Sequence, residues 1–165
     1  MRFLSLIIVF SSLLFSCNSP AQNGPDGKQE TFNISKTDAE WKAQLTPLAY
    51  KVLRHENTER AFSSELNDNH EVGTYVCAAC GSAVFESKHK FDSGTGWPSF
   101  DREVEGNVAF SKDRKLGYSR TEEHCASCGG HLGHVFNDGP RETTGERHCI
   151  NGAALKFIPK NGKSE

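Results

Sequence analysis

The sequence predicts a mainly β domain, in which antiparallel sheets form a small barrel-like core behind short N-terminal helices. After residue 71, short runs rich in Val, Phe and Tyr alternate with Gly, Asp and Ser, which is typical of strands joined by tight turns. The runs follow one another too closely for alternating β-α units, which favours antiparallel sheets. Two C-x-x-C motifs in the same region indicate a metal site among these strands.

The composition limits the range of partners. The 165 residues suit one domain with its own core, and 15 glycines with 11 phenylalanines suit a turn-rich β domain with an aromatic core. A formal charge of −2 gives no electrostatic reason to expect a nucleic-acid partner.

The first residues are typical of a secretory leader. Arg2 precedes an apolar run over residues 3–15, shorter than the roughly 20 residues of a membrane-spanning helix, so residues 1–16 are expected to be a signal peptide. Cys17 stands where a bacterial lipoprotein is acylated. We therefore expect an exported protein of the cell envelope, anchored to a membrane by a lipid on Cys17. Ordinary cleavage nearby, with Cys17 free or removed, is the alternative.

A flexible tether over residues 17–33 is expected to precede one globular domain over residues 34–165. Ser35 or Asp38 can cap a first short helix, and Thr46 with Pro47 at the first helical position starts a second. Short strands are predicted at residues 74–76, 83–85, 108–110, 116–120 and 155–158.

The paired cysteines predict a structural metal site. Cys77 with Cys80, and Cys125 with Cys128, offer four thiolates, the ligand set that zinc takes in tetrahedral geometry. A glycine follows each pair and allows the tight turn that directs both sulfurs to one point. Four thiolates leave no open position, so we expect one structural Zn²⁺ per chain. Two disulfides are the alternative, because an exported protein permits them.

Cys149 is the candidate nucleophile by elimination, since the other cysteines have structural or lipid-anchoring roles. In an extended segment Arg147 lies on the same face as Cys149 and would favour its thiolate, while His148 points to the other face and receives no role. A buried, inert cysteine in a strand is the alternative at this point.

Three further motifs make the chain resemble the methionine sulfoxide reductase B family, whose enzymes reduce the R epimer of methionine sulfoxide. The two cysteine pairs match the zinc site of that family, and the resemblance covers about residues 36–160, within the expected catalytic domain. The motifs are Gly94-Thr95-Gly96-Trp97-Pro98-Ser99-Phe100, His131-Leu132-Gly133-His134-Val135-Phe136 and Arg147-His148-Cys149-Ile150-Asn151.

The resemblance implies a reaction on oxidised methionine in proteins, and free methionine sulfoxide is a further possible substrate. Cys149 would attack the sulfoxide sulfur and become a sulfenic acid. His131, His134 and Asn151 match positions that bind or protonate the sulfoxide oxygen, and Arg147 matches the arginine that supports the thiolate.

The resemblance also implies an apolar wall for the S-methyl group, formed by Trp97 and Phe136. Without it, Trp97 would more often be a core residue, and the two histidines would more often be core or surface groups. His131 and His134 are three residues apart and face opposite sides of a regular strand. Both reach one site only if the strand is bulged, for which Gly133 is a suitable place.

Thr95 is the main departure from the family. Many members carry a resolving cysteine there, whereas threonine cannot form a disulfide with Cys149. The sulfenic acid is therefore expected to be reduced by an external thiol, with a thioredoxin-like protein as donor. A zinc-ribbon binding module and a thiol oxidoreductase that uses a C-x-x-C pair are the alternatives from other classes.

Overall fold

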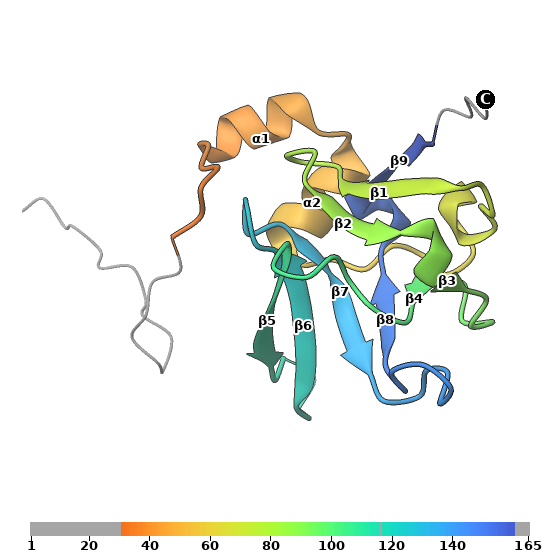
Figure 1. Ribbon diagram of the computed structural model, residues 1–165. Helices are drawn as coiled ribbons and strands as arrows, with labels where there is room; N and C mark the ends of the chain where they lie inside the picture. Colours follow the sequence, from red (N-terminus) through yellow and green to blue (C-terminus); the bar gives the residue numbers. More distant parts are fainter. Residues whose placement is uncertain (1–30, 116, 161–165) are drawn as a thin grey trace, which may run out of the picture. The chain divides into compact units, whose positions relative to one another are not determined.

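The computed structural model describes residues 31–115 and 117–160, and Figure 1 shows how their elements are arranged. The expected signal peptide, Cys17 and the tether up to residue 30 lie outside the described residues. The described residues from Phe32 onward belong to one compact unit, in which the Phe32 ring meets His124 edge-on. No helix in this described part is long and apolar enough to cross a membrane.

The first helix, α1, spans Asp38–Gln44 and is capped by Thr37 rather than by Ser35 or Asp38. The Thr37 hydroxyl accepts the backbone N–H of Glu40, and the Glu40 carboxylate accepts the backbone N–H of Thr37 at 2.8 Å. This reciprocal capping box satisfies two N-terminal donors at once. It explains why the helix begins one residue after Thr37.

The second helix, α2, spans Pro47–His55 and starts as predicted, with the Thr46 hydroxyl accepting the Ala49 N–H at 3.2 Å. Its buried side includes Val52 and Leu53. Arg54, near its end, donates to the backbone carbonyl of Cys128 at 3.1 Å. The helix therefore packs against the second cysteine pair.

Two antiparallel sheets follow, and both are open (Figure 1). The barrel-like closure that the sequence suggested is therefore wrong for the described strands, because each sheet keeps two outer strands that pair on one side only. The first sheet has the order β2-β1-β9, and the second has the order β3-β4-β8-β7-β6-β5. The strands are β1 Gly73–Cys77, β2 Ala83–Glu86, β3 Lys90–Phe91, β4 Ser99–Phe100, β5 Val108–Asp113, β6 Arg120–Cys125, β7 His131–Phe136, β8 Arg147–Ile150 and β9 Leu155–Pro159, with 3-10 turns η1 Glu65–Asn67, η2 Ser87–His89 and η3 Gly152–Ala154.

The strand predicted at residues 116–120 is wrong at residues 117–119, because these form part of the β5–β6 hairpin turn. The N–H of Gly117 donates to the carbonyl of Arg114 at 3.1 Å, and Gly117 has a left-handed φ of 82°. The strand begins only at Arg120 and continues to Cys125. This shift places two glutamates, Glu122 and Glu123, inside the sheet.

The core between the two sheets and α2 is aromatic, as the composition predicted. Phe85 of β2 stacks on Phe100 of β4 at 4.4 Å between ring centroids, and Tyr75 of β1 meets Phe100 edge-on at 5.0 Å. All three side chains are fully buried. This packing joins the three-stranded sheet to the six-stranded sheet and leaves the other face of the latter available for chemistry.

Strand β7 carries a bulge next to Gly133, where the sequence predicted one. Glu123 of β6 pairs with Gly133, but the next residue of β6, His124, pairs with His131. Leu132 is therefore an additional residue on β7, and the alternation of side chains reverses across it. As a result His131 turns to the same side as His134.

Candidate active site

The two cysteine pairs converge at the ends of β1 and β6. The four sulfurs lie within 4.8 Å of one another. Cys77 Sγ is 3.8 Å from Cys128 Sγ, and Cys80 Sγ is 3.5 Å from Cys125 Sγ. Four thiolates around one zinc at about 2.3 Å stand about 3.8 Å apart, so the cluster fits such an ion. All four are free thiols, and the alternative of two disulfides is wrong.

Cys149 lies in β8, near the middle of the six-stranded sheet. It pairs with Ser99 of β4 on one side and with His134 of β7 on the other. Directly opposed residues of neighbouring antiparallel strands project to the same face. Cys149 and His134 are therefore neighbours on the sheet face opposite the aromatic core.

Burial raises the pKa of the Cys149 thiol above its ordinary value. The positive charge of Arg147 and a hydrogen bond from Thr95 lower this pKa, but they offset the burial only in part. Arg147 thus acts in the predicted direction without making the resting thiol acidic. The thiol is mostly protonated at neutral pH.

Arg147 is held rigidly beside Cys149. Its Nε–H donates to Asp138 Oδ1 at 2.8 Å and its Nη2–H donates to Asp138 Oδ2 at 3.0 Å, a bidentate pair. The guanidinium carbon also lies 4.6 Å from the ring centroid of Phe136. Phe136, predicted as a substrate wall, therefore packs against the arginine, and Asp138 is a residue that the motifs did not indicate.

The two predicted histidines meet on the face of Cys149, each with a carboxylate partner. Their rings are 5.4 Å apart between centroids. His131 donates from Nδ1 to Glu122 at 2.7 Å, and His134 donates from Nε2 to Asp113 at 3.0 Å. Burial lowers the pKa of His134 despite the hydrogen bond to Asp113, so His134 is mostly neutral at neutral pH.

Each imidazole keeps one ring nitrogen for other chemistry. His131 Nε2 is buried and has no hydrogen-bond partner among the described residues. Asp113 is itself fixed by an ion pair with Arg120 and by the backbone N–H of Lys115. Sequence reasoning missed Asp113 and Glu122 because their roles follow from the pairing of β5 with β6, which no local motif records.

His148 lies on the opposite, inner face of the sheet, as predicted for an extended segment. It is 1% exposed and donates from Nδ1 to Glu123 at 2.8 Å. Although burial lowers the pKa of His148, the hydrogen bond and charge of Glu123 raise it above the ordinary value. Its ring lies 5.9 Å from that of Phe85, so His148 belongs to the core and not to the reacting face.

The amide of Asn151 bonds to backbone through both of its polar atoms, and the role predicted for Asn151 in binding the sulfoxide oxygen stays a prediction. Its Nδ2 donates to the carbonyl of Leu132 at 3.0 Å, and its Oδ1 accepts the N–H of Glu59 at 2.9 Å. The indole N–H of Trp97 in turn donates to the carbonyl of Glu59 at 3.2 Å. Asn151 thus positions the site by joining the β7 bulge to the segment that holds Trp97.

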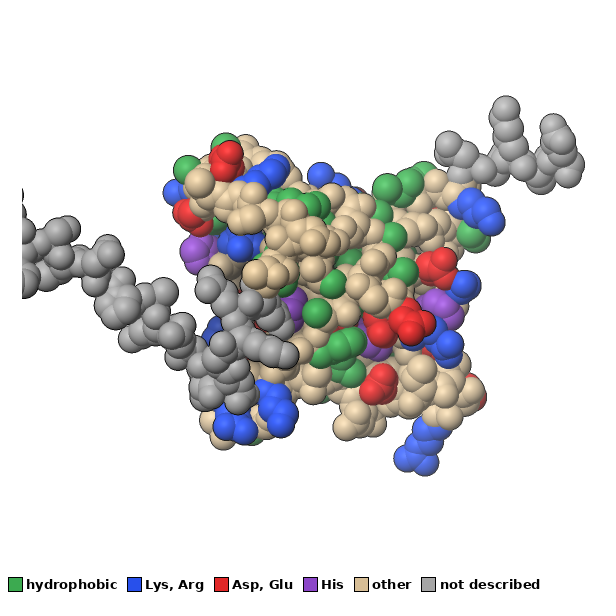
Figure 2. All heavy atoms as spheres, turned by 60° about the vertical axis from the view of Figure 1, so that its left-hand side comes forward, with side chains coloured by type: hydrophobic (Ala, Val, Ile, Leu, Met, Phe, Trp, Pro, Cys, Tyr) green, Lys and Arg blue, Asp and Glu red, His purple; other side chains and the backbone are tan. Residues whose placement is uncertain are grey.

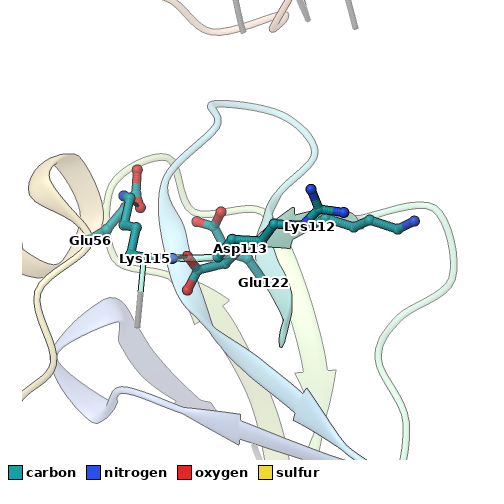
Figure 3. A pocket seen from close by; sticks show the side chains of 6 residues that line it. Glu56, Lys112, Asp113, Lys115 and Glu122 are labelled. Atoms are coloured by element: carbon teal, nitrogen blue, oxygen red, sulfur yellow. Dashed lines mark hydrogen bonds and ion pairs between the residues drawn. The ribbon is translucent and has the colours of Figure 1, made fainter. Parts of the chain in front are cut away.

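A pocket of about 410 Å³ opens beside the two histidine-binding carboxylates (Figure 3). The lining is charged throughout, which suits water or polar groups rather than a methyl group. Trp97 does not line this pocket, and its role as an apolar wall stays a prediction. The pocket is lined by Glu56, Lys112, Asp113, Arg114, Lys115 and Glu122.

Charges of both signs are interspersed on the face of the molecule that Figure 2 shows, with Lys and Arg between Asp and Glu. The absence of a nucleic-acid partner stays a prediction, as does the envelope localisation.

The geometry defines a class of protein: a mainly β protein in which one thiol lies beside two carboxylate-bound imidazoles, apart from a four-thiol cluster that could hold a metal ion. Residues 45–159 match the SelR domain family. Among curated proteins, one from Leptospira interrogans, "Peptide methionine sulfoxide reductase MsrB", is 54% identical over 127 residues, which are 76% of this chain and 96% of that protein.

Relatives with the same name occur in other bacteria. The protein from Bradyrhizobium diazoefficiens is 52% identical and the match covers 82% of this chain and 99% of that protein. The protein from Leifsonia xyli is 50% identical, over 82% of this chain and 97% of that protein. The chain therefore belongs to the SelR-domain family of methionine sulfoxide reductases B, which are oxidoreductases.

Proposed function

We propose that this member of the family reduces the R epimer of methionine sulfoxide, in oxidised proteins and also as the free amino acid, by attack of Cys149 on the sulfoxide sulfur. The observation that carries the proposal is the pairing of Cys149 with His134, with His131 turned to the same face by the bulge. A thiol and two imidazoles meet there, away from the metal cluster.

The reaction begins with the thiolate of Cys149. It attacks the sulfoxide sulfur, whose oxygen is protonated by His134 after the free ring nitrogen of that imidazole has taken up a proton. The oxygen is transferred to the cysteine sulfur, so the sulfoxide is reduced by two electrons to methionine and Cys149 is oxidised to a sulfenic acid. The proton that the oxygen takes up is the one that the Cys149 thiol has given up, so the step consumes no further proton.

Arg147 and His134 favour the reactive state of the Cys149 thiol. Because burial raises the pKa of Cys149, the thiolate needs positive charge nearby, and the fixed guanidinium of Arg147 supplies it. A proton from the thiol can pass to the neutral His134 beside it, which then holds the acid required at the oxygen. His134 thus acts first as the base that deprotonates Cys149 and then as the acid that protonates the sulfoxide oxygen.

The second half of the cycle uses an external reductant. Thr95 and Arg147 both hydrogen-bond to Cys149, and neither can form a disulfide with it. The sulfenic acid therefore reacts with one external thiol to give a mixed disulfide and water, and a second external thiol releases Cys149 and leaves with the disulfide. A thioredoxin-like protein, with two thiols in one molecule, suits both steps.

The four-cysteine cluster is proposed to hold one structural Zn²⁺. Cys77, Cys80, Cys125 and Cys128 would bind it with thiolate sulfurs, and no ligand position would remain for substrate. The ion would tie β1 to β6 and thereby support the strand next to β7. It has no part in the reaction at Cys149.

The location proposed from residues 1–17 is the bacterial cell envelope, with a lipid on Cys17. Metabolic labelling with a radioactive fatty acid should label the wild-type chain and not the Cys17→Ser variant. Equal labelling of both chains, or none of either, would rule out the anchor without affecting the proposed reaction.

The activity is tested with separate R and S methionine sulfoxide substrates, each given to the wild type and to Cys149→Ser. We expect turnover of the R epimer alone, and a decrease of more than about a thousandfold in the variant, because the nucleophile is removed. Turnover of the S epimer, or activity that survives in the serine variant, would overturn the proposal.

A further inference from the structure

Phe62 is the most exposed large apolar side chain of the described residues, at 70%. Its backbone has a left-handed φ of 62°, a conformation that bulky residues rarely adopt. Such backbone strain persists only where the surrounding structure enforces it, and it gathers at functional sites. Neither solvent exposure nor local backbone preference explains a phenylalanine here.

The ring of Phe62 rests on the loop that carries the proposed active-site residues. The N–H of Phe62 donates to the carbonyl of Gly96 at 2.7 Å. A Cβ added to Gly96 would lie 2.7 Å from the Phe62 ring, so only glycine lets the ring approach this closely. The neighbours of Gly96 are Thr95, which hydrogen-bonds to Cys149, and Trp97, the proposed methyl wall.

The segment before Phe62 is fixed to the same site by Glu59. The buried Glu59 carboxylate accepts the N–H groups of Gly152 and Ala153, each at 2.7 Å. Its own N–H and carbonyl bond to Asn151 and Trp97. The loop over residues 59–62 is therefore hydrogen-bonded to several parts of the proposed site. It holds the exposed ring of Phe62 at the border of that site, where the ring offers an apolar contact.

We propose that Phe62 is a docking contact for the polypeptide that carries the oxidised methionine, and that this contact raises kcat/KM for protein-bound sulfoxide alone. This rests on the proposed function. With the sulfoxide between Cys149 and Trp97, the rest of the substrate chain passes over Gly96 and reaches Phe62. The occupant is an extended segment with an apolar residue close to the methionine, since an aromatic ring offers apolar contact area and no charge.

The test compares kcat/KM for free methionine R-sulfoxide and for a pentapeptide with Leu next to the R-sulfoxide. In Phe62→Asn, which keeps the left-handed turn because asparagine tolerates it, the peptide value should fall about five- to tenfold, as expected for the loss of a partly buried aromatic contact. The value for the free amino acid should stay within about twofold of the wild type.

Two controls separate docking from folding. Phe62→Tyr keeps the ring and should keep the wild-type value for the peptide. Val72→Ala removes part of another strongly exposed apolar side chain, 68% exposed and outside the site, and should change neither value. Equal losses on both substrates in Phe62→Asn, or no loss on the peptide, would overturn the inference. Failure of the wild type to reduce either R-sulfoxide would instead count against the proposed function.

Discussion

The described cysteines fall into two regions that treat the same side chain in opposite ways. Cys77, Cys80, Cys125 and Cys128 gather within 4.8 Å of one another at strand ends, each close to further sulfurs. Cys149 lies within a strand, with an imidazole, a hydroxyl and a guanidinium as neighbours. Four clustered thiolates can fill all the ligand positions of a metal ion and are then unreactive. A single thiol among hydrogen-bond donors stays available for reaction.

The reactivity proposed for Cys149 depends on its neighbours and not on an acidic resting thiol. Burial keeps the pKa of Cys149 raised, so few thiolates exist before substrate binds. Arg147 and Thr95 both act to lower that pKa, and the fixed Asp138 keeps Arg147 in place. Changes in the first region should therefore affect stability, and changes in the second should affect chemistry.

The largest expected effect is on the metal cluster. Cys128→Ser removes one thiolate, so bound zinc should be lost and the free energy of unfolding should fall by several kcal/mol, because metal binding contributes to folding. Metal analysis and chemical unfolding measure both quantities. Cys149→Ser is the matched control and should keep zinc and stability. A Cys128→Ser protein with full zinc content would contradict the claim that the four clustered cysteines bind the metal.

A smaller effect is expected from the imidazoles. His134→Gln should lower kcat by about a hundredfold, because the proton donor is lost. Asp113→Asn keeps the imidazole of His134 but weakens the hydrogen bond that fixes its position, and should lower kcat on the order of tenfold. Glu56→Gln changes a carboxylate of the same pocket that binds Lys115 and no histidine, and should leave kcat almost unchanged. Equal effects of the Asp113 and Glu56 changes would contradict the positioning role.

The charge beside the thiol should set how its reactivity depends on pH. In Arg147→Gln the pKa of Cys149 should rise further, because the nearest positive charge is removed. The rate of alkylation by iodoacetamide, followed from about pH 6 to about pH 10, should therefore reach half its maximum at a higher pH than in the wild type. Arg102→Gln, an exposed arginine outside the site, should leave the curve unchanged. A shift toward lower pH would refute the sign of this effect.

The smallest effect should come from Thr95. Thr95→Val keeps the shape but removes the hydrogen bond that lowers the pKa of Cys149, so the alkylation curve should move to higher pH by less than in Arg147→Gln. Thr95→Ser retains the hydroxyl and should behave as the wild type. If Thr95→Val shifted the curve more than Arg147→Gln, the hydrogen bond rather than the charge would dominate.

The sequence predicted those features that depend on a short stretch of chain. The start of α2 follows from Thr46 and Pro47, and the bulge of β7 was predicted from the spacing of His131 and His134 around Gly133. Each depends on the geometry of a few neighbouring residues, which a motif records.

Features that depend on pairing across the sheet could not be predicted. The bonds of Asp113 and Glu122 to the histidines follow from the register of β5, β6 and β7, which is a long-range property. The role of Phe62 depends on the φ of its own backbone and on contact with Gly96, residues far apart in sequence. The open sheets likewise depend on how the outer strands end, which composition does not record.

The central claim, that Cys149 alone carries the oxidation, is tested most directly by one turnover without reductant. The enzyme is mixed with an equal amount of R-sulfoxide peptide and dimedone, which reacts with sulfenic acids, and the product is mapped by mass spectrometry. We predict one adduct per chain, on Cys149, with Cys77, Cys80, Cys125 and Cys128 unmodified. A disulfide between Cys149 and any other cysteine of the chain, or an adduct on the cluster, would contradict the account.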